Sequence, residues 1–297
     1  MKYNNILGNK VEKEYLNEQI KKDNIVHSYL FTGIESIGKK MIAQEFAKDI
    51  LCFEKNIDLC NCKSCISFLG YNHPDFNLIN KESETIKIEQ IRELTNKIIE
   101  KPILSSKKVY IINDAEKMTK EAQNCLLKTL EEPPEFAVLI LITSNENLLL
   151  TTVKSRCMKI NFHAISDEEM KKYCEENLGY DAIDLKRIKS FEGSIGKAIK
   201  FKENESEYTQ IEELIDEIQN NNISTILQKA KFIYNKEKVI EFLNYMINYL
   251  YNNQKKNSNY LHCIKYINDG INKLKSNGNL DMNLDMMFIK MWEILKK

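Results

Sequence analysis

Apolar and polar residues follow two different patterns along the 297-residue chain, and the change falls near residue 163. In the first part, short apolar runs of strand length alternate with stretches of helical periodicity. This repeated order of strand, helix and strand predicts a parallel α/β sheet. The expected strands are Tyr29–Thr32, Asp75–Ile79, Val109–Ile112, Ala137–Thr143 and Met158–Phe162.

Three helices are expected between these strands. Apolar residues recur at helical spacing from Ala43 to Leu51 and again from Ile88 to Ile98. A further helix is expected over Glu121–Glu132, where Pro133 and the proline after it end the pattern. Each of these helices has the length of a crossover between parallel strands.

The residues after His163 have no strand-like runs. Residues 165–202 have the pattern of a small helical unit, 204–222 that of a polar junction with one helix, and the chain from Ile223 is helical throughout. We therefore expect three domains: an α/β base over 1–163, a small helical domain over 164–203 and an all-helical domain over 204–297.

Composition adds constraints on compartment and partners. Lys+Arg and Asp+Glu both number 43, so the chain has no overall field that would attract nucleic acid, and any such binding needs a local patch or a partner. Neither a signal peptide nor an apolar run of the ~18 residues needed to span a membrane is evident. We expect a cytoplasmic protein whose eight cysteines are reduced.

A candidate phosphate-binding loop follows the first expected strand. Gly33, Gly38 and Lys39 match the spacing G-x-x-x-x-G-K-[ST], but Lys40 stands where the hydroxyl residue belongs. In such loops backbone N–H groups hold phosphates and the hydroxyl ligates Mg²⁺. A plain glycine turn is the alternative interpretation. The strand, loop and helix context favours descent from a phosphate loop that has lost one metal ligand.

The second metal ligand is altered as well. An Asp followed by an acidic base usually ends the neighbouring apolar strand of such sites. Here the strand that ends at Ile112 is followed by Asn113 and Asp114. A neutral amide oxygen is a much weaker Mg²⁺ ligand than a carboxylate. Because both protein ligands of the same Mg²⁺ ion are replaced, we predict a site that no longer hydrolyses ATP rapidly.

Four cysteines lie within 14 residues, at Cys52, Cys60, Cys62 and Cys65. Four thiolates suit a tetrahedral Zn²⁺ that would close a loop with little core of its own. The alternative is four free thiols. We expect a zinc module over residues 52–65.

These motifs together resemble the AAA+ clamp-loader family, and most of all the delta-prime subunits of the bacterial DNA polymerase III clamp loader. The resemblance covers roughly residues 5–163. It rests on the loop, the cysteine cluster and four further segments, namely 27–33, 113–118, 124–134 (which contains KTLEEPP) and 155–157 (Ser-Arg-Cys). It implies an AAA+ base, a helical lid and a helical collar that joins five subunits in a ring.

The resemblance also assigns roles to particular residues. Ser144 falls at sensor 1, and Gly196 falls where active ATPase subunits carry the sensor 2 arginine. Arg156 falls at the arginine that reaches the ATP of a neighbouring subunit; a surface salt bridge is its alternative role. The family's zinc module has the spacing C-x2-C-x2-C, from which the Cys60–Cys62 spacing departs.

The expected function is therefore that of a stator subunit that lacks ATPase activity, and ATP binding is doubtful. Its partners would be the delta and gamma/tau subunits in a heteropentamer, and through them the sliding clamp and primer–template DNA. The alternatives are a gamma/tau-type ATPase motor of the same assembly and, more distantly, an unrelated AAA+ regulator. The length of the chain, Lys40 and Asn113 argue against a motor.

Overall fold

A computed structural model describes the chain over residues 6–54, 60–80, 85–180, 183–235, 237–276 and 278–296. The chain forms two compact units. The first comprises residues 1–169 with 194–196, and the second comprises residues 170–193 with 197–297. Over the described ranges, no helix has the length and apolar character that a membrane crossing requires.

The described part of the first unit contains a five-stranded sheet in the order β2-β3-β4-β1-β5. All neighbouring strands pair in parallel, which confirms the predicted sheet. The strands start or end within one residue of their predicted limits. They are β1 Ser28–Thr32, β2 Phe76–Ile79, β3 Lys108–Ile112, β4 Ala137–Thr143 and β5 Met158–Asn161.

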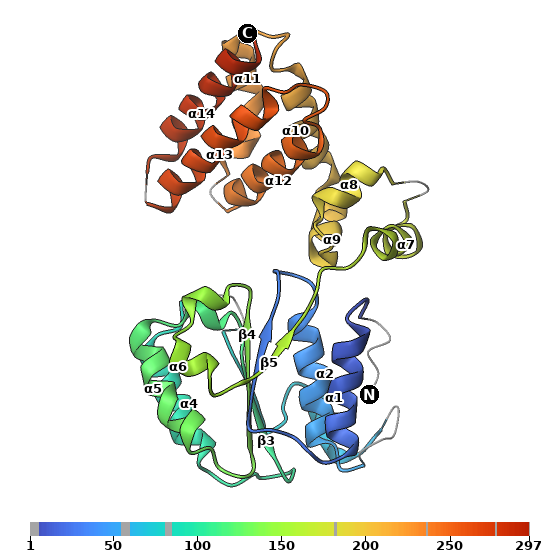
Figure 1. The fold of residues 1–297 in the computed structure, drawn as a ribbon, viewed down its shortest axis with the longest axis vertical. Helices are drawn as coiled ribbons and strands as arrows, with labels where there is room; N and C mark the ends of the chain where they lie inside the picture. Colours follow the sequence, from blue (N-terminus) through green and yellow to red (C-terminus); the bar gives the residue numbers. More distant parts are fainter. Residues whose placement is uncertain are drawn as a thin grey trace. The chain divides into compact units, whose positions relative to one another are not determined.

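Helices cover both faces of this sheet. Figure 1 shows α1 and α2 on one face and α4, α5 and α6 on the other. Thr119 caps α5 by accepting a hydrogen bond from the Ala122 N–H, and the helix ends two residues before Pro133. The elements are α1 Lys10–Lys21, α2 Lys39–Leu51, α3 Lys63–Leu69, α4 Ile88–Ile98, α5 Lys120–Glu131 and α6 Thr151–Lys154, with 3₁₀ turns η1 Ala115–Lys117 and η2 Glu146–Leu148.

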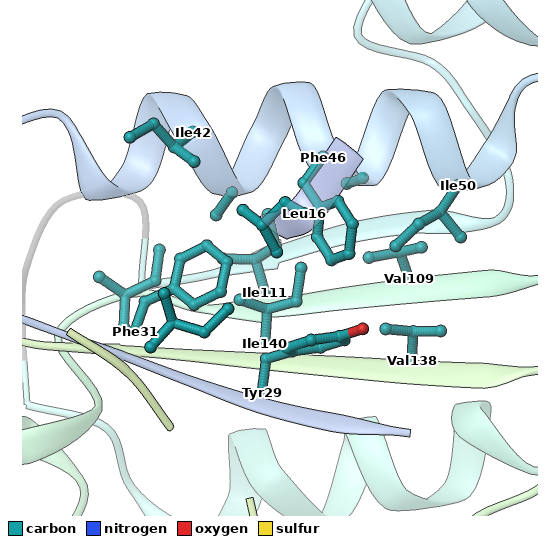
Figure 2. Close-up of a cluster of buried hydrophobic side chains, with 14 of the residues drawn as sticks. Leu16, Tyr29, Phe31, Ile42, Phe46, Ile50, Val109, Ile111, Val138 and Ile140 are labelled. Atoms are coloured by element: carbon teal, nitrogen blue, oxygen red, sulfur yellow. The ribbon is translucent and has the colours of Figure 1, made fainter. Parts of the chain in front are cut away.

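The period of two along each strand divides the core into two layers. Tyr29 and Phe31 of β1 face α2, where Phe46 packs edge-to-face on the Tyr29 ring with ring centroids 5.2 Å apart (Figure 2). Leu30, between them, belongs to the cluster on the opposite face, with α4 and α5. Burial of each such side chain contributes roughly 1.5–3 kcal/mol, and together these layers fix the register of the sheet.

Because all strands are parallel, the sheet has two chemically different ends. The carboxyl end carries the loops that follow the strands, and the amino end carries the segments that precede them. The chain turns at the carboxyl end from β1 into α2, which runs back so that Leu51 lies at the amino end. There its carbonyl oxygen contacts Ser105, which precedes β3.

The described elements from residue 167 onward are all helical, which confirms the predicted fold class of an α/β base followed by a helical region. Aromatic rings form part of this core: Tyr208 stacks on Phe201 with ring centroids 5.0 Å apart and packs against Tyr245. The helices are α7 Asp167–Asn177, α8 Leu185–Ser190, α9 Ile195–Glu203, α10 Glu205–Glu217, α11 Ile223–Lys229, α12 Val239–Asn252, α13 Tyr260–Lys275 and α14 Leu280–Leu295, with the 3₁₀ turn η3 Ala230–Tyr234.

Candidate functional site

The glycine loop at the carboxyl end connects β1 to α2 in a tightly constrained path. Gly33 has a φ of 146°, and a Cβ atom there would lie 2.4 Å from the Phe162 carbonyl oxygen. Gly38 has a φ of 92° and immediately precedes α2. Both positions therefore require glycine. The loop has the strand-to-helix setting of a phosphate-binding loop.

Lys39 is bound to its own loop. Its Nζ atom donates to the carbonyl oxygens of Gly33 and Ile34, each at 2.6 Å, and the residue is 6% exposed. Burial lowers the pKa of Lys39, although the nearby carboxylates of Glu116 and Asp114 oppose this shift. Two of the three N–H groups of the ammonium that would meet a phosphate are thus directed at protein oxygens. Lys40, in the hydroxyl position, is a half-buried cation and cannot ligate a metal ion.

The residues after β3 are engaged with their neighbours. The Asn113 side-chain amide donates to the Asn80 carbonyl oxygen at 3.5 Å, and the Asn80 amide donates to the Asn113 carbonyl oxygen at 3.1 Å. Asp114 adopts a left-handed conformation with a φ of 48° at the start of η1 and lies 4.0 Å from the Lys117 ammonium. Both side chains therefore contact neighbouring residues of the same unit.

Ser144, directly after β4, binds a residue that sequence reasoning did not single out. Both its backbone N–H, at 3.0 Å, and its hydroxyl donate to one carboxylate oxygen of Glu116. Burial would raise the pKa of Glu116, but these hydrogen bonds and others from the same turns lower it overall. The only sequence signal for this contact was a second acidic residue close after β3.

The segment 194–196 packs against the glycine loop within the first unit. The Ser36 carbonyl oxygen accepts hydrogen bonds from the Gly196 N–H at 3.1 Å and from the Ser194 hydroxyl at 3.0 Å. A Cβ atom on Gly196 would lie 2.6 Å from the Ser36 Cβ. Side chains larger than glycine at residue 196 therefore require the loop to move.

Arg156 lies between α6 and β5, at the amino end of the sheet. Its Nη2 atom is 2.6 Å from a carboxylate oxygen of Glu131, the last residue of α5, and its Nη1 atom donates to the Thr152 carbonyl oxygen at 2.9 Å. The side chain is one-third exposed. It lies at the end of the sheet opposite the chain's own glycine loop.

The cysteine cluster also lies toward the amino end. The Sγ atoms of Cys52, Cys60, Cys62 and Cys65 all lie within 4.8 Å of one another. Cys52 follows α2, and Cys65 is in the first turn of α3; both are buried, while Cys60 and Cys62 are half-buried. A tetrahedral Zn²⁺ with Zn–S distances of ~2.3 Å separates its sulfurs by about 3.8 Å, so a small contraction of this cluster would accommodate it.

The thiols of this cluster have unequal acidity. Burial raises the pKa of Cys52 to about 11 and raises that of Cys65 further. Burial also opposes ionisation of Cys62, but hydrogen bonds from the backbone N–H groups of Cys65 and Phe53 lower its pKa to about 7. Without a cation, the buried pair is protonated at neutral pH. A divalent cation would supply the charge that several adjacent thiolates need, so the donor set fits zinc.

The remaining cysteines are separate from this cluster. Cys174 and Cys263 are buried, whereas Cys125 and Cys157 are only partly buried. Cys125 and Cys157 instead pack at the margin of the core layer between the sheet and α5.

The parallel sheet and the glycine loop after β1 define an AAA+ fold. Its known structures include a DNA polymerase III gamma subunit-related protein from Thermotoga maritima, which is 16% identical and aligns over 96% of this chain and 99% of that one with a TM-score of 0.55. At this identity the likeness concerns the fold alone.

The chain belongs to the family described as DNA polymerase III, delta subunit, whose profile matches residues 8–166. It is 34% identical over 204 residues to the DNA polymerase III subunit delta′ of Bacillus subtilis, covering 63% of this chain and 62% of that protein. It is 33% identical over 184 residues to the subunit tau/gamma of Haemophilus influenzae, covering 59% of this chain and 27% of that protein. The aligned part is thus an incomplete portion of both relatives.

Proposed function

We propose that this chain is a delta-prime-type subunit of a bacterial clamp loader. It does not hydrolyse ATP itself but helps other subunits place a sliding clamp on primed DNA, and it supplies Arg156 to the ATP site of a neighbour. Membership of the DNA polymerase III delta family and similarity to delta′ of Bacillus subtilis support this role.

One contrast carries the proposal. At the carboxyl end, Lys39 is bound to the carbonyl oxygens of its own loop, and Lys40 and Asn113 replace both ligands of the catalytic metal. At the amino end, the partly exposed guanidinium of Arg156 lies away from that loop. The guanidinium pairs here with Glu131, which is the salt bridge of its alternative role. In the proposed role it would exchange this carboxylate for a phosphate that another molecule brings to it.

A gamma/tau-type ATPase motor is the second candidate, because tau/gamma subunits are among the relatives at similar identity. A motor must hold Mg²⁺ against the phosphates throughout hydrolysis. A Lys40 ammonium repels that ion, and Asn113 offers it only a neutral oxygen. Turnover of ATP by the isolated protein at the rate of a motor subunit would favour this candidate.

The proposed role assigns a task to each region. Residues 1–163 form the AAA+ base, residues 164–203 the lid, and residues 204–297 the collar through which the chain assembles with delta and gamma/tau subunits in a heteropentamer. The complex, rather than this chain alone, would contact the sliding clamp and the primer–template DNA. Such a replication subunit acts in the cytoplasm.

We further propose that Cys52, Cys60, Cys62 and Cys65 bind one structural Zn²⁺. The proximity of the four Sγ atoms supports this assignment. The ion would cross-link the end of α2 to α3. Helix α3 has little core of its own, since Ile66 and Leu69 on it are more than half exposed. Because all four positions are filled by thiolates, the ion would leave no open position for catalysis.

The arginine role is tested by substitution in a reconstituted clamp loader. Arg156→Ala should lower DNA-stimulated ATPase activity and clamp loading, and Arg156→Lys should not restore them, because Lys lacks the planar donor fork. An arginine supplied in trans contributes ~10³–10⁵ in rate at one site, but several sites share the work, so the loss in the whole complex should be partial.

Arg92→Ala is the matched control, because it removes an exposed arginine from α4 of the same unit. Assembly is checked by size-exclusion chromatography before each assay. Unchanged activity in both Arg156 variants of an assembled complex would show that Arg156 is only structural.

A further inference from the structure

Four chain segments meet in one buried hydrogen-bonded cluster at the amino end of the sheet. The Leu51 carbonyl oxygen accepts hydrogen bonds from the hydroxyls of Ser64 and Ser105, each at 2.7 Å. The His73 Nε2 atom lies 2.9 Å from the Ser64 oxygen and 3.3 Å from the Ser105 oxygen. Ser64 is fully buried and His73 is 5% exposed. We call Leu51, Ser64, His73 and Ser105 the histidine cluster.

The hydrogen-bond pattern assigns the proton on the imidazole. The Asp75 N–H donates to His73 Nδ1 at 3.1 Å, so Nδ1 carries no hydrogen and Nε2–H is the donor of the neutral ring. Both hydroxyl protons point to the Leu51 carbonyl, which leaves the hydroxyl oxygens to accept Nε2–H. Each polar group of the cluster is therefore paired in one consistent arrangement, as buried networks require.

Asp75 fixes the segment that carries Ser105. Its carboxylate accepts hydrogen bonds from three consecutive backbone N–H groups, those of Ile103, Leu104 and Ser105, at 2.7–2.8 Å. Asp75 is 2% exposed, and its own carbonyl oxygen accepts from Val109 at the start of β3. The histidine cluster is thus tied directly to the sheet.

The cluster contacts the metal module beside its two buried thiols. The Leu51 carbonyl belongs to the peptide bond that joins Leu51 to Cys52, and Ser64 immediately precedes Cys65. Phe68 of α3 also lies against the His73 ring, with centroids 6.4 Å apart. No such bonds connect the cluster to Cys60 or Cys62 among the described contacts. Two of the four ligands are therefore held by the sheet.

We propose that His73, although not itself a ligand, holds Cys52 and Cys65 in position for zinc before the ion arrives. This inference rests on the proposed zinc site. The preformed pair would bind the ion first, and Cys60 and Cys62 would complete the tetrahedron. The affinity for zinc should then depend on His73, since loss of the cluster lets the end of α2 move relative to α3.

The test is zinc affinity of the full chain, measured by competition with a chromophoric chelator at pH 7.5. His73→Ala should weaken zinc binding by about tenfold to 100-fold, the size of effect seen when groups that orient metal ligands are removed. His73→Gln places an amide donor near the position of Nε2 and should recover most of the affinity. Ser105→Ala is a milder variant that keeps the test valid if His73→Ala does not fold.

His262→Ala, which removes an exposed imidazole from α13, is the matched control and should bind zinc as the wild type does. The rise in melting temperature on zinc addition should be smaller in His73→Ala than in the wild type. If His73→Ala lowers the melting temperature of the zinc-free and zinc-loaded proteins equally and keeps its affinity, the positioning role is wrong while the zinc site stands. If the wild type itself binds no zinc, both the site and this inference fail.

Discussion

The two ends of the central sheet differ in how they use their polar groups. At the carboxyl end, Lys39, Asn113 and Ser144 all bind other parts of the same unit. At the amino end, four thiols form a cluster without disulfide bonds, and Arg156, although paired with Glu131 and the Thr152 carbonyl oxygen, remains one-third exposed. Parallel α/β sheets usually bind their ligands at the carboxyl end. Under the proposed function, the groups that bind an ion and act on a partner lie at the other end in this chain.

Under the proposed function, this contrast means that a fold keeps a site's architecture after the site's chemistry has gone. The glycine loop is needed to join β1 to α2, since a Cβ at Gly33 would collide with the backbone of Phe162. The loop geometry therefore persists for structural reasons. Lys40 and Asn113 are not subject to that constraint, and under the proposed function they are the changes that prevent binding of a metal ion.

The largest expected effect is at the amino end. Cys65→Ser should reduce zinc content from one ion per chain to near zero, because a neutral hydroxyl is a poor zinc ligand and Cys65 is 2% exposed. Elemental analysis of protein purified without chelators measures this. Cys125→Ser, at a partly buried thiol outside the cluster, should keep its zinc. If Cys65→Ser keeps as much zinc as Cys125→Ser, at one ion per chain, Cys65 is not a ligand.

A smaller effect is expected at the carboxyl end. Gly196→Ala should lower the free energy of unfolding by ~1–3 kcal/mol, because its Cβ would meet the Ser36 Cβ at 2.6 Å. Ser36→Gly removes that atom, so the double variant should regain most of the loss. Gly270→Ala is the control, since its Cβ would make only an ordinary contact at 3.5 Å. Denaturant titration measures the free energy of unfolding of each variant. If the effects of Gly196→Ala and Ser36→Gly on it are additive in the double variant, the collision is ruled out.

The smallest expected effect concerns pH. Burial lowers the pKa of His73 below the usual 6.5, against the opposing charge of Asp75. Between the lowered pKa and 6.5 the unfolded chain binds more protons than the folded chain, so the free energy of unfolding should fall as pH drops through 6.5. The slope is at most ~1.4 kcal/mol per pH unit for one group.

Zinc-free His73→Gln lacks this group and should lose less stability than the zinc-free wild type between pH 7.5 and 5.5. Denaturant titrations at both pH values measure this change in the free energy of unfolding. The contribution of the carboxylates, which both proteins share, cancels when the two changes are subtracted. Identical pH dependence in the two proteins would show that His73 does not titrate on unfolding.

The sequence predicted the features that depend on local pattern. Strands buried on both faces are continuous apolar runs, so β4 was predicted with the limits that the structure has. The spacing of the cysteines predicted their cluster. Lys40 and Asn113 were found because the motifs around them fix which residue type belongs at each position.

Contacts between distant segments could not be predicted in this way. The bond between Gly196 and Ser36 joins residues 160 positions apart, and the histidine cluster joins segments that are adjacent only once the sheet has formed. His73 gave no signal of this role in the sequence, since no periodicity marks a buried hydrogen-bonding residue. Likewise, nothing local indicated that Glu131 would bind Arg156.

The most direct test of the difference between the two ends compares one substitution at each in the same assay. Lys39→Met removes the loop ammonium but keeps its apolar stem, and Arg156→Ala removes the guanidinium at the amino end. Each variant is assembled with partner subunits, and DNA-stimulated ATPase activity is measured against the wild-type complex. Our account predicts wild-type activity for Lys39→Met and reduced activity for Arg156→Ala. Loss of activity in Lys39→Met together with wild-type activity in Arg156→Ala would contradict it.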